Sequence, residues 1–141
     1  MYRQMLIIVT MLTGSAAAWA DSIPIQPGLW EMTSSMTMPM LPQPQVNTMT
    51  ECMNKDYLSL DEVGSGDMDP ACSFETAQLD DSRVSWSFEC PMEGGGKSRG
   101  TWEATSHGDR VEGHGNVTVD MQGQSMEMTM QWTGKRIGDC P

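Results

Sequence analysis

The chain has 141 residues and a formal net charge of −11, with 8 basic side chains against 19 acidic ones. A surface with this charge repels nucleic acids and anionic membranes, so neither is expected as a partner. The length predicts a single domain that is large enough to bury a core.

The first twenty residues have the features of a secretory signal peptide. Arg3 precedes an apolar run from Met5 to Leu12, and the pattern Ala18-Trp19-Ala20, with its two small residues, closes the segment. This pattern predicts cleavage after Ala20. The run is much shorter than the roughly 20 apolar residues that span a membrane. We therefore expect no stable membrane anchor and an exported domain made of residues 21–141.

The four cysteines follow this segment, and their number is even. No CxxC or HxxxH spacing is present, so two disulfides are predicted in the exported chain rather than a zinc site. Four cysteines allow three pairings. The four cysteines are Cys52, Cys72, Cys90 and Cys140.

One stretch, "CSFETAQLDDSRVSWSFEC" at 72–90, selects among these pairings. The turn signal at 80–82 lies in its middle and predicts a β-hairpin. In that register Cys72 lies opposite Cys90, Phe74 opposite Phe88, and Thr76 opposite Trp86, all on one face. Elimination then pairs Cys52 with Cys140.

Alternating apolar and polar residues predict the other strands. In "LWEMTSSMTM" (29–38) the large apolar side chains share one side, and "VNTMTEC" (46–52) indicates a return strand. The one helix predicted is "MNKDYLSLDEV" (53–63). Three later segments also alternate: "GTWEATS" with Trp102 and Ala104 on one face, "RVEGHGNVTVDM" with Val111, Val117, Val119 and Met121, and "MEMTMQW".

About seven strands joined by short turns predict an all-β, antiparallel, up-and-down meander. One short helix cannot cover the apolar face of such a sheet. We therefore expect the sheet to curl into a small barrel or half-barrel, with Gly113 and Gly115 allowing a sharp bend within one strand.

The methionine rows "MTMPM" (36–40) and "MEMTMQW" (126–132) admit three interpretations. They line a core, because methionine fills irregular apolar gaps; they line a cavity that accepts an apolar ligand; or their thioethers bind Cu(I) or Ag(I). The two rows become neighbours if a barrel closes between its first and last strands. The metal alternative uses Met126, Met128 and Met130.

Catalytic signatures are not found in the sequence. GxSxG and HExxH do not occur, and disulfide formation leaves no free thiol. The acidic loop with Asp61, Glu62, Asp67 and Asp69 does not fit the calcium pattern DxDxDG, so a solvated loop is expected. We predict a protein that is not an enzyme and that needs no cofactor.

Gly28-Leu29-Trp30 resembles the GxW signature of lipocalin-type barrels. In those barrels a basic residue from the last strand packs over the tryptophan. The resemblance implies a cation–π contact from Lys135 or Arg136 to Trp30.

A wider resemblance covers the mature chain. "PGLWEMT" near its start, four cysteines and "GKRIGDC" near its end are together similar to a bacterial exported family, domain-of-unknown-function family 3617. The resemblance implies a Gram-negative periplasmic protein with a small β-rich domain and no established activity.

The leading hypothesis is non-enzymatic binding of an apolar small molecule or a partner segment at a Met/Trp-lined face. The alternatives are Cu(I)/Ag(I) binding and a structural or assembly role. The side chains predicted to line the ligand site are Trp30, Met32, Met36, Met38, Trp86, Trp102, Met126, Met128, Met130 and Trp132.

Overall fold

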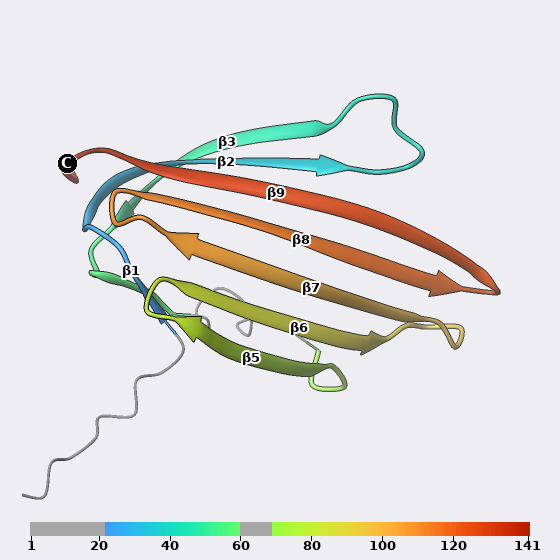
Figure 1. Ribbon diagram of the computed structural model, residues 1–141. Coiled ribbons are helices and arrows are strands. Elements are labelled where there is room, and N and C mark those ends of the chain that lie inside the picture. Colours follow the sequence, from blue (N-terminus) through green and yellow to red (C-terminus); the bar gives the residue numbers. More distant parts are fainter. Residues whose placement is uncertain (1–21, 60–68) are drawn as a thin grey trace, which may run out of the picture.

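The computed structural model describes residues 22–59 and 69–141, in which all regular structure is β (Figure 1). Seven antiparallel strands form one sheet in the order β3-β2-β9-β8-β7-β6-β5, and two short strands form a second sheet. The large sheet comprises β2 (Gly28–Thr37), β3 (Gln45–Met53), β5 (Ser73–Asp80), β6 (Arg83–Pro91), β7 (Lys97–Ser106), β8 (Arg110–Met121) and β9 (Gln124–Gly138).

The connections are up-and-down, as predicted. Strands β5 to β9 follow one another as neighbours, and the β2–β3 hairpin is added to β9. The predicted alternation is confirmed by the strand register. Val111, Val117 and Val119 lie opposite residues of β9 in one phase, and Trp102 lies opposite Trp86 in the same phase. One face of the sheet is therefore apolar.

The second sheet pairs β1 (Ser22–Pro24) with β4 (Tyr57–Ser59), and we call it the β1–β4 ribbon. The helix predicted over 53–63 is wrong where the chain is described. Met53 ends β3 and Tyr57–Ser59 is a strand, while residues 60–63 lie outside the described residues. Backbone pairing with β1, together with the packing of Leu58 against the core, overrides the local helical tendency.

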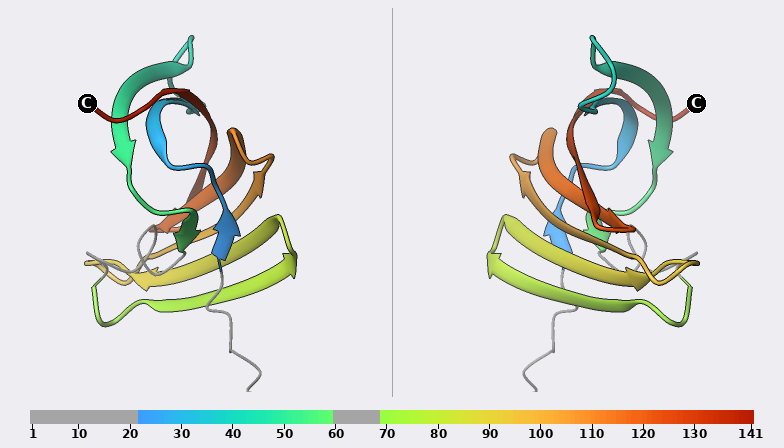
Figure 2. Two further views of the ribbon diagram at one scale, coloured as in Figure 1. Left: turned by 90° about the vertical axis from the view of Figure 1, so that its left-hand side faces the viewer. Right: turned by 90° about the vertical axis from the view of Figure 1, so that its right-hand side faces the viewer.

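Of the two predicted forms, barrel or half-barrel, the closed barrel is wrong. β3 and β5 are the two edges of an open sheet and do not pair with each other. The sheet nevertheless twists strongly, so its two ends face different directions (Figure 2). The β1–β4 ribbon lies in the hollow between them, and it covers part of the apolar face that closure would have covered.

Both predicted disulfides are present, Cys72–Cys90 and Cys52–Cys140. The hairpin register is also confirmed, with Phe74 opposite Phe88 and Thr76 opposite Trp86. In the chain-entropy model the bridges, which span 18 and 88 residues, contribute about 3 and about 4–5 kcal/mol respectively. The longer bridge joins the end of β3 to the segment after β9.

The core lies between the β1–β4 ribbon and the sheet. Ile23 packs with Val84, Trp86 and Ala104, and Ile25 packs with a second cluster around the fully buried Trp30. Hydrogen bonds hold the ribbon to the β7–β8 turn. The Gly108 carbonyl accepts from the Gln26 amide at 2.9 Å, and the buried Ser106 hydroxyl donates to the Pro24 carbonyl.

Large side chains of the apolar face lie over glycines of neighbouring strands. A Cβ at Gly113 would overlap the Trp132 indole, and a Cβ at Gly115 would overlap Trp102. Gly100 leaves the same kind of space for the Phe88 ring. Gly113 and Gly115, predicted as bending points, thus have a packing role. Each glycine lets a ring lie flat on the sheet, close to the backbone.

We predict that Gly113→Ala lowers the free energy of unfolding by about 1–3 kcal/mol, because the added methyl group overpacks the Trp132 indole. Gly138→Ala is the matched control. Gly138 also lies in β9, and nothing lies within 4 Å of its hypothetical Cβ, so its change should stay within about 0.5 kcal/mol. Urea denaturation of the oxidised variants measures both, and equal effects would contradict this packing role.

Candidate functional site

The apolar face that the β1–β4 ribbon leaves uncovered forms a groove of about 500 Å³. All four tryptophans of the described residues line it, and the methionines of its wall come from β2, β3 and β9. We call this space the groove. Its lining includes Ile25, Trp30, Met32, Ser34, Asn47, Met49, Glu51, Met53, Leu58, Trp86, Phe88, Trp102, Val111, Met130 and Trp132.

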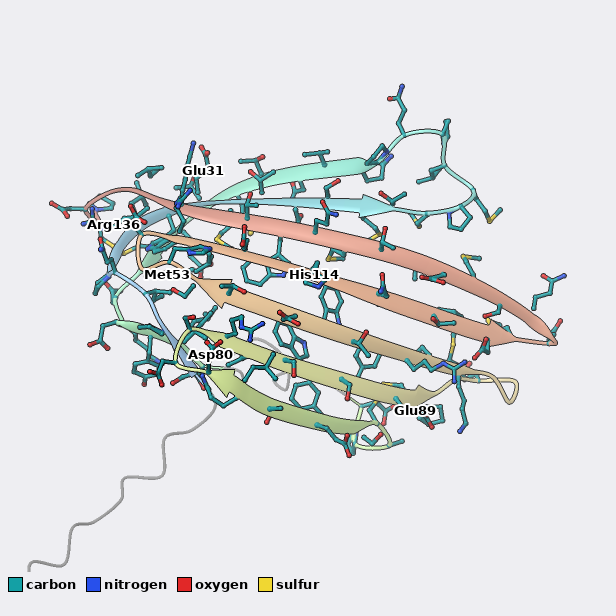
Figure 3. The ribbon with its side chains drawn as sticks, viewed as in Figure 1. Glu31, Met53, Asp80, Glu89, His114 and Arg136 are labelled. Atoms are coloured by element: carbon teal, nitrogen blue, oxygen red, sulfur yellow. A yellow bond between two sulfur atoms is a disulfide. The ribbon has the colours of Figure 1, made fainter. Side chains whose placement is uncertain are left out.

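The alternation of each strand sends these side chains to one face and polar side chains to the other. Glu31, one position after Trp30, lies opposite Lys135 on the outer face, and their side chains form an ion pair of 3.1 Å. Figure 3 shows Glu31 above β2, pointing away from the hollow, and Met53 below it. The groove therefore has an apolar lining, whereas the outer face of the sheet is polar.

Aromatic packing gives the groove a fixed wall. Trp86 and Trp102 stack across β6 and β7, with ring centroids 6.1 Å apart and planes inclined by 9°. Trp30 closes one end. It is 0% exposed, and its indole N–H donates to the Gln26 carbonyl at 2.8 Å. Because these rings are held by glycine contacts, stacking and a hydrogen bond, the aromatic part of the groove is preformed.

The methionine rows lie side by side, because β2 pairs with β9. Met36 lies directly opposite Met130, and Met32 lies opposite Met49 of β3. Toward the open end the thioethers become accessible to solvent, and Met126 is 39% exposed. Flexible methionines thus line the side of the groove opposite the stacked indoles.

Six of the ten predicted lining residues lie in the groove, namely Trp30, Met32, Trp86, Trp102, Met130 and Trp132. The other four do not line it. Met36 and Met128 are half-buried further along the same face, Met126 is at the exposed end of β9, and Met38 follows the end of β2. Strand phase placed all ten on one side, but phase alone does not say how far along a strand the groove extends.

Several lining residues were missed by the sequence analysis. Leu58 lies in the β1–β4 ribbon and Ile25 directly follows β1. The alternation did not predict this ribbon. Asn47, Met49 and Glu51 come from β3, whose alternation within "VNTMTEC" was present in the sequence but weak. The register opposite β2 reveals their common face.

Trp30 does not receive the predicted cation–π contact. Lys135 pairs with Glu31 on the outer face. Arg136 donates from Nε to the Pro27 carbonyl at 2.7 Å and from its guanidinium to Asp139. In the described part of the chain, the cation–π pair is Lys55 over the Tyr57 ring, at 5.6 Å. A register shift between Leu29 and Trp30 accompanies this arrangement.

The shifted pKa values belong to ion pairs outside the groove. The side-chain hydrogen bond from Arg83 is the main cause that lowers the pKa of Asp80 to about 2, and the Ser82 amide adds to it. The hydrogen bond from Lys97 lowers the pKa of Glu89. Asp80 orders the turn between β5 and β6, so this interaction is structural. It favours the folded state above the ordinary carboxyl pKa and is lost as the pH falls toward 2.

Residues 22–59 and 69–141 contain no group of three or more His, Cys, Asp or Glu side chains that could hold a metal ion. Of the acidic loop, Asp61, Glu62 and Asp67 lie outside the described residues. Asp69 accepts a hydrogen bond from the Ala71 amide at 2.9 Å. These same residues contain no helix that is long and apolar enough to cross a membrane.

Fold and site together define a class of small all-β protein, in which one twisted, open antiparallel sheet carries an apolar groove on its concave face. Residues 25–140 match the model of the family described as protein of unknown function (DUF3617). The protein belongs to this family, as the resemblance in the sequence implied. Comparison with curated proteins found no match, and comparison with solved structures found none.

Proposed function

We propose that this protein is an exported, non-enzymatic binding protein that holds an apolar small molecule or partner segment in the groove. The observation that supports this best is the groove itself, an open space lined by four indoles and by methionine thioethers. Its volume of about 500 Å³ lies within the range of roughly 300–1,000 Å³ that is typical of ligand sites.

The chemistry of the lining favours binding over catalysis. Glu51 is the one ionisable side chain among the described lining residues, and no histidine, lysine or cysteine accompanies it there. Indole rings supply large apolar contact areas, and thioethers adapt to ligands of different shape at low cost. A preformed aromatic wall opposite an adaptable methionine wall suits an apolar guest whose outline varies.

Export is supported by the signal-like segment 1–20 and by the two disulfides, which persist in oxidising compartments. We expect protein recovered from the periplasmic fraction of a Gram-negative host to begin at Asp21. N-terminal sequencing checks this start, and a chain found only in the cytoplasm with residues 1–20 intact would refute export.

The binding proposal predicts that the neutral fluorophore N-phenyl-1-naphthylamine binds in the groove with enhanced emission. Ser34→Trp places a bulky ring in the groove and should weaken binding about tenfold or more, equivalent to about 1.4 kcal/mol. Fluorescence titration of the oxidised protein measures this effect.

Ser35→Trp is the matched control, because Ser35 is the next residue of β2 and points to the outer face, opposite Gln131. It should bind the fluorophore as the parent protein does. No saturable binding to the parent protein, or equal loss in both variants, would overturn the proposed binding function.

A second candidate function is Cu(I) or Ag(I) binding, and the register between β2 and β9 favours it. Met36 lies directly opposite Met130, and side chains so paired have Cβ atoms roughly 4.5–5.5 Å apart. Met128 lies two residues along the same face. The originally predicted set of Met126, Met128 and Met130 thus gains Met36 as a ligand from the neighbouring strand.

The metal candidate predicts 1:1 Cu(I) binding, measured by anaerobic competition with a chromogenic chelator. A Met36→Leu/Met130→Leu double variant should lose this binding, since leucine keeps the volume but has no thioether. Met40→Leu is the control, because Met40 is 78% exposed beyond β2. Equal Cu(I) affinity in the double variant and the control would exclude the site.

A further inference from the structure

The groove carries one negative charge and no positive one among its described lining residues, and this asymmetry bears on the ligand. Glu51 provides the carboxylate. It lies on the edge strand β3, directly opposite Trp30 of β2, so the two side chains share the concave face. Met49 and Met53 flank it on that face.

The Glu51 carboxylate is available to a ligand. It forms no hydrogen bond or ion pair with the residues of 22–59 and 69–141, whereas nearby cations are engaged. Lys135 pairs with Glu31 and Arg136 with Asp139. Lys55 lies over the Tyr57 ring. An exposed carboxylate at the rim of an apolar groove therefore keeps its charge uncompensated by a neighbouring side chain.

The indole rings of the groove favour the same sign of ligand charge. The face of an indole is the negative part of its quadrupole and attracts ammonium groups, most strongly among the aromatic side chains. The groove contains four indoles, two of them stacked. A cation in the groove is attracted by the Glu51 carboxylate and by the half-buried indoles of Trp102 and Trp132, whereas an anion is repelled by both kinds of group.

We propose that the ligand of the groove is a small amphipathic cation, with an ammonium head held at Glu51 and an alkyl or aromatic body against the indoles and thioethers. This inference rests on the proposed binding function and narrows it to one chemical class. The net charge of −11 raises the local concentration of such cations and lowers that of fatty acids or other anionic amphiphiles.

Three amphiphiles with the same ten-carbon chain test the inference, each used below its micelle-forming concentration. They are decyltrimethylammonium, 1-decanol and decyl sulfate, and each is titrated as a competitor of N-phenyl-1-naphthylamine. We expect decyltrimethylammonium to bind more tightly than 1-decanol and decyl sulfate to bind least. Measurements near 0.15 M salt, where the screening length is about 8 Å, suppress attraction by distant charges.

Variants at Glu51 test whether this carboxylate causes the preference for a cationic ligand. Glu51→Gln should weaken decyltrimethylammonium binding by about three- to fivefold, the upper part of the range expected for one exposed ion pair, and should leave 1-decanol unaffected. Glu51→Lys should reverse the order, so that decyl sulfate binds more tightly than decyltrimethylammonium. Glu127→Gln is the matched control, because it removes the same charge from an exposed position on the outer face.

The outcomes distinguish a failure of this inference from a failure of the proposed binding function. Binding of 1-decanol and the fluorophore without a preference for the cation would overturn the inference and leave the binding function standing. Equal losses in Glu51→Gln and Glu127→Gln would also overturn it, since bulk charge alone would then explain the preference. If neither neutral compound binds, the binding function and the inference fall together.

Discussion

Exposing an apolar face seven strands wide to water costs free energy, and the way this face is covered governs the rest of the molecule. The β1–β4 ribbon supplies only a few side chains for the purpose, chiefly Ile23, Ile25 and Leu58. They seal the end of the sheet that contains the buried Trp30. The remaining part of the face forms the groove, so core and candidate binding site are two portions of one continuous surface.

Features that repeat within a few residues could be predicted from the sequence. Alternation with a period of two identified the strands of the large sheet and the face to which each tryptophan points. The spacing of Cys72 and Cys90 around a turn fixed a hairpin register, and the remaining disulfide followed from it. Six residues of the groove were predicted on this basis, because strand phase is a local property.

Features that depend on distant partners could not be predicted in the same way. Tyr57–Ser59 is too short to show a period, and it becomes a strand because Ser22–Pro24 pairs with it. Whether the sheet closes depends on the relation between β3 and β5, which no local pattern encodes. The position of Glu51 at the rim follows from the edge position of β3. Lys135 or Arg136 was predicted to stack on Trp30. Lys135 instead pairs with Glu31, and Arg136 binds the Pro27 carbonyl, which is distant in the chain, and the Asp139 carboxylate.

The position of β9 between β2 and β8 has a consequence for folding. This strand is the last one of the sheet to be synthesised, yet it joins the β2–β3 hairpin to the meander of β5 to β8. Until it emerges, the first hairpin has no neighbour and the bridge between Cys52 and Cys140 cannot form. A chain of this topology therefore completes its large sheet and its longer disulfide only after the last strand has been synthesised.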